Sequence, residues 1–225
     1  MWRPPERLRF QSGPGRIPTR EEAARSLLFS PVTVARKLAG ARLVEDLRAE
    51  PAAVESALDA ITDTMARHAR AALEAGADGL FFATQAATPE ALTAEESARY
   101  EMPRTRRILD AVEGRSAFTL LHVHGRDIYF DQAAALPAHA LNWHDRRTAP
   151  DLGDGQRRST GAVVGGLGEG HTLLTGPPDA VSAQVRDAVA QTGGRGVILG
   201  PGCVLPLATP EEHLSAVIAA VRAAA

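Results

Sequence analysis

The chain has 225 residues, of which 44% are hydrophobic and 23% are charged, enough apolar material for one large globular domain. Its formal net charge of −2 gives no overall field that would favour nucleic acid or an anionic membrane surface. A single cysteine excludes an intrachain disulfide framework, and we expect neither a signal peptide nor a bilayer-spanning segment. These features predict a cytoplasmic protein that acts on a small molecule.

The first 25 residues form a locally basic segment that prolines and glycines interrupt. This pattern is typical of a solvated or poorly ordered arm, so we place the folded domain at residues 26–225. Near the end of the arm, residues 19–22 have capping-box spacing and predict a short helix.

Continuous apolar runs predict six strands, at residues 27–32, 77–84, 117–124, 138–143, 161–166 and 196–200. Segments with helical periodicity or helix-start signals alternate with them, at residues 51–75, from Thr88, around residues 108–112, and at 126–136, 178–191 and from Thr209. In the last helix we expect an inward face made of Leu214, Val217, Ile218 and Val221. The glycine-rich residues 165–170 predict a flexible loop rather than a phosphate-binding one, because no Walker lysine follows.

The predicted strands are uniformly apolar rather than alternating, which indicates a parallel sheet covered by helices. A complete (β/α)₈ barrel usually takes about 250 residues and eight strands. The sequence therefore predicts an α/β, TIM-barrel-like fold that corresponds to the carboxyl-terminal portion of a barrel with its first strands missing. An open doubly wound sheet is the alternative.

Polar residues gather where the predicted strands end, and in parallel α/β folds function lies at the carboxyl ends of strands. The residues in question are Thr84, His122, His124, Asn142, His144, Asp145 and Cys203. We therefore expect the functional site at this edge of the sheet.

Three of these residues predict a metal site. His122 and His124 are two apart on one strand, so their side chains point to the same face. Cys203 follows a Gly-Pro-Gly turn after the last strand, and zinc takes thiolate and imidazole ligands readily, with three protein ligands in a catalytic site. His144 or Asp145 would replace one ligand, be a fourth ligand, or act as a general base. The alternative for the histidines is hydrogen bonding within the core, and for Cys203 simple burial.

A zinc ion in such a site would deprotonate a substrate thiol, the nucleophile needed for methyl transfer to sulfur, or would activate water for hydrolysis. Arg146 and Arg147 would bind a substrate carboxylate or phosphate, or form an exposed charge pair. Together with Thr84 and Asn142, they are the predicted substrate-binding residues.

From Phe29 onward, the ordered set of motifs resembles the uroporphyrinogen decarboxylase superfamily, which includes zinc-dependent methyltransferases acting on corrinoid proteins and coenzyme M. The resemblance rests on four segments: Phe29-Ser30-Pro31-Val32-Thr33-Val34-Ala35, Ala75-Gly76-Ala77-Asp78, Ala140-Leu141-Asn142-Trp143, and Leu199 to Pro206 with Thr209-Pro210-Glu211.

The resemblance implies a zinc site more than a decarboxylase site. The methyltransferase branch uses a His-x-Cys pair and a later Gly-Cys as ligands; His122 and Cys203 match, and His124 stands where the second thiolate would be. The decarboxylases place a histidine where this chain has Pro201. They also use residues of the first barrel strands, which this chain lacks.

The leading hypothesis is a zinc-dependent, methyltransferase-like enzyme acting on a thiol or on a corrinoid methyl group, and the resemblance implies a corrinoid protein as partner. One alternative is a carboxy-lyase of tetrapyrrole biosynthesis, which would need no metal and would bind substrate acetates through Arg146 and Arg147. The other is a non-catalytic fragment or vestigial binding protein. Because an incomplete barrel leaves open sheet edges, a homodimer is also a possible form of the protein.

Overall fold

A parallel six-stranded sheet organises the protein, and the computed structural model describes residues 25–224. The arm at residues 1–24 and the short helix expected at residues 19–22 lie outside the described residues. The strands are β1 (Arg25–Phe29), β2 (Gly79–Thr84), β3 (Phe118–Val123), β4 (Ala140–Trp143), β5 (Ala162–Leu167) and β6 (Val197–Pro201). The six predicted strand regions are thus confirmed, with shifts of a few residues at their ends.

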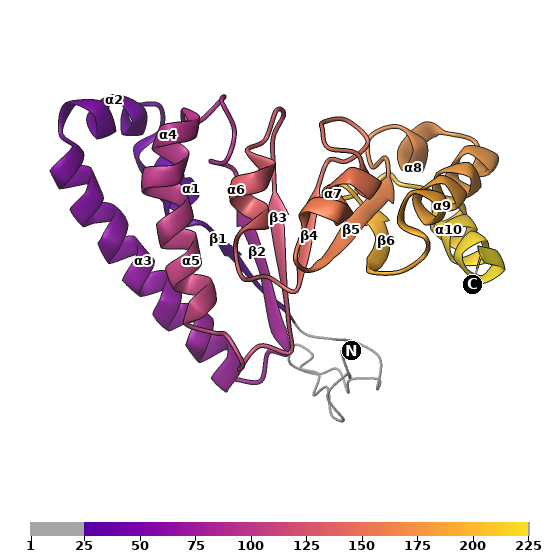
Figure 1. Cartoon of the computed structure of the whole chain (residues 1–225), viewed down its shortest axis with the longest axis horizontal. Helices are drawn as coiled ribbons and strands as arrows, with labels where there is room; N and C mark the ends of the chain where they lie inside the picture. The colour runs from indigo at the N-terminus through magenta and orange to yellow at the C-terminus, as the bar shows by residue number, and fades with distance from the viewer. Residues whose placement is uncertain (1–24, 225) are drawn as a thin grey trace.

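The strands lie side by side in chain order, and every neighbouring pair is parallel. A doubly wound sheet reverses its strand order at a switch point, whereas a barrel winds in one direction. The sequential order therefore identifies an arc of a barrel, with β1 and β6 as its two edges within the described residues. The helices at the two ends of the arc, from α2 (Arg42–Ala49) to α5 (Met102–Asp110) and from α8 (Thr172–Thr175) to α10 (Glu211–Ala224), lie far apart in Figure 1.

Helices connect the strands, as the alternation predicted. Their bounds are α1 (Pro31–Ala39), α2 (Arg42–Ala49), α3 (Pro51–Glu74), α4 (Ala94–Glu96), the π-helical turn η1 (Ser97–Glu101), α5 (Met102–Asp110), α6 (Phe130–Ala134), α7 (Leu152–Arg158), α8 (Thr172–Thr175), α9 (Pro178–Thr192) and α10 (Glu211–Ala224). Within the described part of the chain, none of these helices has the length and apolarity needed to cross a bilayer.

The helix predicted to open at Thr88 begins instead at Ala94. Thr93 caps it: its hydroxyl accepts a hydrogen bond from the Glu96 amide at 3.2 Å, and Glu96 accepts one from the Thr93 amide at 2.8 Å. Thr88 uses its hydroxyl differently, donating to the carbonyl of Arg126 at 2.7 Å. The prediction failed because two threonines offered the same cap signal, and the first one ties together the loops after β2 and β3.

Gly165 and Gly166 were assigned both to a strand and to a flexible loop, and the strand prediction is the one confirmed, since β5 continues to Leu167. Gly165 and Gly166 lie where neighbouring side chains leave no room for a Cβ atom on β5. A Cβ on Gly165 would lie 2.5 Å from an Asp145 carboxylate oxygen, and one on Gly166 would lie 2.6 Å from the Cβ of Ala188. The glycines therefore permit close packing of β5 against α9 and against the loop after β4.

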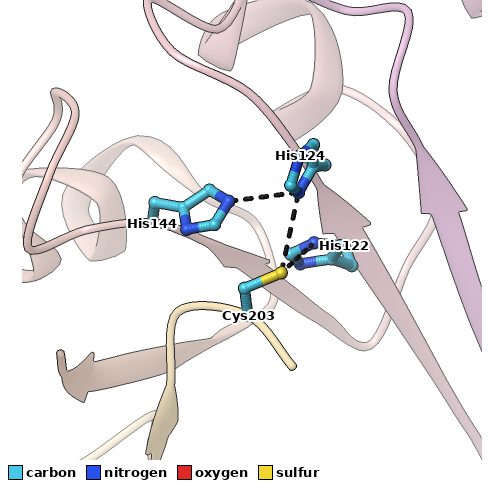
Figure 2. A group of neighbouring side chains, drawn as sticks. All are labelled: His122, His124, His144 and Cys203. Carbon is cyan, nitrogen blue, oxygen red and sulfur yellow. Dashed lines mark hydrogen bonds between the residues drawn. The ribbon is translucent and has the colours of Figure 1, made fainter. Parts of the chain in front are cut away.

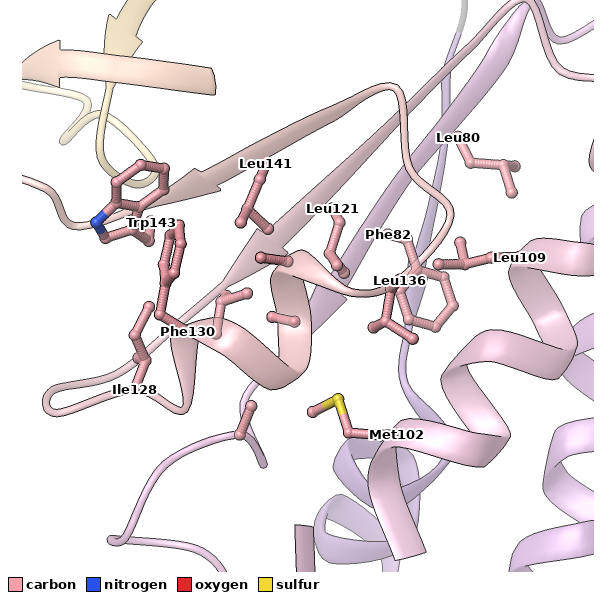
Figure 3. Close-up of a cluster of buried hydrophobic side chains, with 14 of the residues drawn as sticks. Leu80, Phe82, Met102, Leu109, Leu121, Ile128, Phe130, Leu136, Leu141 and Trp143 are labelled. Carbon is pink, nitrogen blue, oxygen red and sulfur yellow. The ribbon is translucent and has the colours of Figure 1, made fainter. Parts of the chain in front are cut away.

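The main core lies between the sheet and α3, α5 and α6, where the side chains of Phe82, Leu121 and Trp143 are almost fully buried. Figure 3 shows Phe130 standing against Trp143, with ring centroids 4.9 Å apart. Because strand side chains alternate, Leu121 and Val123 enter this core and His122 between them points to the opposite face of the sheet. Core packing thus fixes which side of β3 carries the histidine.

The face predicted to be buried on α10 is only partly correct. Ala216, Val217 and Ala220 pack against the cluster that contains Val181 and Val185 of α9. Leu214, Ile218 and Val221, three of the four residues expected inward, are 37%, 53% and 37% exposed. Small side chains allow α10 to lie close to α9, and this contact rotates the larger apolar residues outward.

Truncation of the core will destabilise the sheet that carries the site. Phe82→Ala removes a fully buried ring, so we expect the free energy of unfolding to fall by about 3–5 kcal/mol. Leu38→Ala is the control, because Leu38 is 78% exposed and its loss is expected to cost no more than about 0.5 kcal/mol. Urea denaturation followed by circular dichroism measures both, and equal costs would contradict this assignment of the core.

Candidate metal centre

Four side chains with metal-binding atoms meet at the carboxyl edge of the sheet (Figure 2). His122 is the last residue but one of β3, His124 and His144 directly follow β3 and β4, and Cys203 lies in the loop after β6. Their donor atoms all lie within 4.8 Å of one another. The structure therefore brings together the three residues predicted as ligands, with His144 as a fourth member of the cluster.

Backbone contacts position the cluster. His122 pairs with Asn142 in the β3–β4 register, and the amide of His124 continues the ladder by donating to the carbonyl of Thr84 at 2.9 Å. The amide of Gly202 donates to the carbonyl of Leu167 at 3.2 Å. A Cβ on Gly202 would lie 2.9 Å from the Cα of His144, so only glycine lets this loop pass so close to the end of β4.

Asn142 determines which nitrogen of His122 faces the cluster. Its Nδ2 donates to the carbonyls of Val164 at 2.8 Å and Pro201 at 3.1 Å, so the orientation of the amide is fixed. Its Oδ1 must then accept a hydrogen bond from His122 Nδ1 at 2.6 Å. The proton of His122 is thereby assigned to Nδ1, and Nε2 presents its lone pair towards Cys203 Sγ, 3.7 Å away.

Glu169 determines which nitrogen of His144 faces the cluster. Its Oε1 lies 2.9 Å from His144 Nδ1, and because an ionised carboxylate only accepts hydrogen bonds, Nδ1 carries the proton. His144 Nε2 then faces His124 Nδ1 at 3.2 Å. Arg147 Nη1 lies 3.2 Å from the same oxygen of Glu169. Glu169 was not among the predicted site residues, because it stands in the segment assigned to a flexible loop.

The electrostatics of the cluster favour a thiolate. The pKa of Cys203 is lowered to about 4 by its contacts with His122, His124 and His144, which outweigh the opposing effect of burial. The pKa of His144 is raised to about 9, first by Cys203 and then by Glu169. Electron-rich atoms this close together need a positive species between them, which is either a proton or a metal ion.

Zinc fits this donor set. With bonds of about 2.0–2.1 Å to nitrogen and about 2.3 Å to sulfur, adjacent ligands of a tetrahedral site lie about 3.3 Å apart for two nitrogens and about 3.6 Å for nitrogen and sulfur. The separation between His124 Nδ1 and His144 Nε2 is 3.2 Å. Those from Cys203 Sγ to His124 Nδ1 and His122 Nε2 are 3.6 and 3.7 Å.

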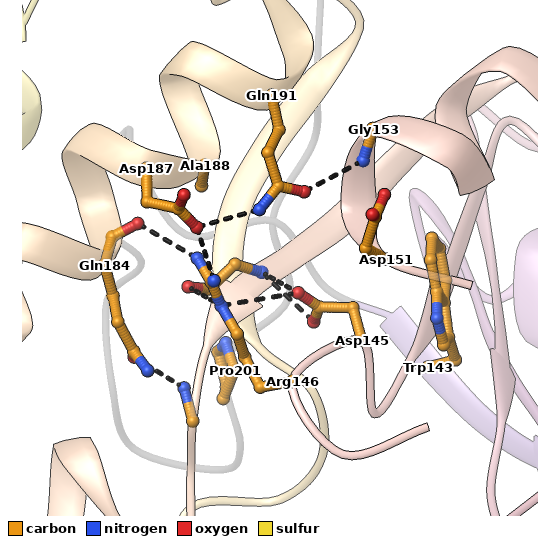
Figure 4. A network of polar contacts seen from close by, with 12 residues as sticks. Trp143, Asp145, Arg146, Asp151, Gly153, Gln184, Asp187, Ala188, Gln191 and Pro201 are labelled. Atoms are coloured by element: carbon orange, nitrogen blue, oxygen red, sulfur yellow. Dashed lines mark hydrogen bonds and ion pairs between the residues drawn. The ribbon is translucent and has the colours of Figure 1, made fainter. Parts of the chain in front are cut away.

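The structure does not bring Asp145 or Arg146 into the cluster (Figure 4). The carboxylate of Asp145 accepts hydrogen bonds from the amide of Gly166 at 3.0 and 3.1 Å, and burial raises its pKa to about 6 against the opposing effect of that amide. Arg146 donates to the carbonyl of Gly166 at 2.8 Å and pairs with Asp187 of α9. Both side chains fasten the loop after β4 to β5 and α9, so of the two predicted fourth ligands only His144 reaches the cluster.

The remaining predicted substrate residues lie around the cluster. Thr84 is fully buried, where its hydroxyl oxygen accepts a hydrogen bond from the amide of Ala86 at 3.1 Å and lies 3.4 Å from that of Ser30. Asn142 contacts His122, as described above. Arg147 lies beside Glu169 and is half-exposed. Among the predicted substrate-binding residues, its side chain is the most accessible to solvent.

Fold and site together define an arc of a parallel α/β barrel with a histidine–cysteine cluster suited to a metal ion. A sequence profile described as "Uroporphyrinogen decarboxylase (URO-D)" matches residues 23–224. The chain therefore belongs to the uroporphyrinogen decarboxylase family, as its motifs indicated.

Similar proteins within the family are methyltransferases. The chain is 29% identical over 169 residues to "Methylcobamide:CoM methyltransferase MtaA" of Methanosarcina barkeri. The aligned residues make up 74% of this chain and 48% of that protein. The protein of the same name from strain Fusaro is 30% identical over 172 residues, with the same coverage. "Methylcobamide:CoM methyltransferase MtbA" of Methanosarcina acetivorans is 24% identical over 195 residues, covering 85% and 55%. The chain thus spans about half the length of the curated relatives it matches.

A solved structure supports the same placement. A methyltransferase from Methanosarcina mazei matches with a TM-score of 0.78 and 26% identity, over 88% of this chain and 57% of that one. A B12-independent methionine synthase from Shewanella sp. matches with a TM-score of 0.54 and 14% identity, over 76% and 54%, which shows a likeness of fold alone.

The lowered pKa of Cys203 predicts its reactivity. A lowered pKa keeps the thiolate at acidic pH, so alkylation by iodoacetamide in metal-free protein will change by less than about twofold between pH 8 and pH 6. An ordinary thiol with a pKa of about 8.5 would slow by roughly two orders of magnitude. Mass spectrometry reports the rate without ambiguity, because the chain has one cysteine.

The same protein in urea is the control, since unfolding separates Cys203 from the histidines and restores the ordinary pH dependence. Added zinc is expected to slow the alkylation of the folded protein. A steep decline towards pH 6 in the folded, metal-free state would contradict the assigned thiolate.

Proposed function

We propose that this chain carries the metal site of a zinc-dependent, methyltransferase-like enzyme that acts on a thiol or on a corrinoid methyl group. The observation that carries the proposal is the gathering of three imidazole nitrogens and a thiolate sulfur within 4.8 Å of one another at the carboxyl edge of the sheet. Three of their separations, 3.2, 3.6 and 3.7 Å, match those of a tetrahedral zinc site. His122, His124 and Cys203 would hold the ion, with His144 as a fourth ligand or as a base.

The residues around the cluster prepare it for this role. Asn142 keeps the lone pair of His122 Nε2 directed inward, and Glu169 does so for His144. A bound zinc ion would supply the Lewis acidity that keeps a substrate thiol ionised at neutral pH. His124 and Cys203 are half-buried rather than fully enclosed, so a small molecule can approach from their side.

The names of the relatives suggest the substrates. Both kinds of curated relative are named for a methylcobamide and CoM. We infer that this chain handles a corrinoid methyl donor and a small thiol acceptor, with a corrinoid protein as partner. One thiolate among the ligands leaves a zinc site with net positive charge, which makes a bound thiolate a weaker nucleophile than a site with two cysteines would.

The contacts of Arg146 and Arg147 do not favour the carboxy-lyase alternative. It required Arg146 and Arg147 to form a cationic pocket for substrate carboxylates. Arg146 pairs with Asp187, and Arg147 lies against Glu169. Carboxylates of the protein itself thus already neutralise both guanidinium groups.

Metal analysis tests the proposal. We expect about one zinc ion per chain after dialysis against a zinc-buffered solution, and loss of that ion in Cys203→Ser, because serine removes the thiolate ligand. His68→Gln is the matched control, since it removes an exposed histidine outside the cluster and will leave the zinc content unchanged. Wild-type protein without zinc, or zinc retained by Cys203→Ser, would contradict the proposal.

Activity requires a separate assay. Zinc-loaded protein is mixed with methylcobalamin and a small thiol, and demethylation of the corrinoid is followed by its visible absorbance. We expect demethylation that depends on zinc and is lost in Cys203→Ser. Zinc-loaded protein that neither binds the thiol nor demethylates the corrinoid would favour a purely structural ion.

A further inference from the structure

The role of Glu169 follows from its burial and its contacts. It lies in the loop between β5 and α8 and is only 5% exposed. Burying a carboxylate is costly unless it is paired and hydrogen-bonded. Glu169 meets this condition through His144 Nδ1 at 2.9 Å and Arg147 Nη1 at 3.2 Å. The loop thus places a charged group against one ring of the cluster.

This contact orients the ring of His144. Because the carboxylate accepts only from Nδ1, the ring turns Nε2 towards the other donor atoms. His144 itself is only 3% exposed, so the surrounding packing leaves its ring little room to rotate. A carboxylate that accepts from the outer nitrogen of a ligating histidine also raises the basicity of the inner nitrogen.

We propose that Glu169 is a positioning residue that holds His144 as the fourth ligand of the metal ion. The ligand set is then His122, His124, His144 and Cys203. This inference rests on the proposed function, because it needs a metal ion at the cluster. It selects the ligand role for His144 over the role of a base, since its Nε2 lies at ligand spacing from His124 rather than facing away from the cluster.

The three imidazoles are then held unequally. His122 is fixed by Asn142, and His144 is fixed by Glu169. For His124, whose Nδ1 faces the cluster, the described part of the chain supplies no hydrogen-bond partner to the other ring nitrogen. A substrate thiol entering a four-ligand site must add as a fifth ligand or replace one, and His124 is the histidine held least firmly.

Zinc affinity measured by competition with a chelating dye tests the role of Glu169. We expect Glu169→Gln to weaken zinc binding about 10- to 100-fold, the usual effect of losing a carboxylate behind a ligating histidine. In a His144→Gln background the same change is expected to alter the affinity less than about twofold, because the ring it orients is gone. A merely structural role would give the same loss in both backgrounds.

Asp145→Asn is the matched control. It neutralises another buried carboxylate, adjacent to His144 in sequence, but its oxygens contact the amide of Gly166 rather than a ring of the cluster. We expect zinc affinity to change less than about threefold. A loss as large as that of Glu169→Gln would mean that buried charge in general, and not the contact with His144, determines the affinity, and would overturn the proposal.

A second measurement needs no variant. X-ray absorption of the zinc-loaded wild-type protein is expected to show one sulfur ligand and the outer-shell scattering of three imidazole rings. One sulfur with the scattering of only two imidazole rings would overturn the proposal and leave His144 outside the coordination sphere. If zinc binding requires Cys203 but its affinity is unchanged in Glu169→Gln, only this inference is overturned. If the wild-type protein binds no zinc, the proposed function is overturned as well.

Discussion

The close approach of one sulfur and three imidazole nitrogens is the interaction on which the rest of the site depends. Donor atoms 3.2–3.7 Å apart repel one another unless positive charge lies between them. Because Asn142 and Glu169 each fix a proton on the outer nitrogen of one ring, neither His122 nor His144 can relieve this repulsion by changing tautomer. At His122 and His144, the positive charge must therefore come from an added proton or from a metal ion.

The sheet supplies the rigidity that this arrangement requires. Parallel pairing aligns the carboxyl ends of β3 and β4, so that the residues that follow the two strands lie next to each other. Glycines at positions 165, 166 and 202 remove the Cβ atoms that would hold β5 and the loop after β6 at a distance. The ion pair of Arg146 with Asp187 then fastens the loop after β4 to α9. Each donor is thus held by an element that is itself packed.

The order of elements and the convergence of His122, His124 and Cys203 were predictable from sequence, because apolar runs mark buried parallel strands and polar residues at their ends share one edge. Glu169 was not, since its partner is 25 residues away and its segment has the composition of a loop. Asn142 was placed at the edge correctly, but only coordinates show that its amide contacts His122 and two carbonyls. The face of α10 was misjudged because periodicity does not reveal that its small residues pack on α9.

The metal-binding side chains come from distant parts of the sequence, so a bound ion would also link those parts of the fold. Cys203 lies 81 residues from His122 in β3 and 79 residues from His124, which follows β3, so an ion bound to all three would act as a cross-link that closes a long loop. The entropic cost of such closure grows only with the logarithm of loop length. The ion would connect the loop after β6, at one edge of the sheet, to β3 in its middle. Its removal would destabilise the final third of the chain before the rest.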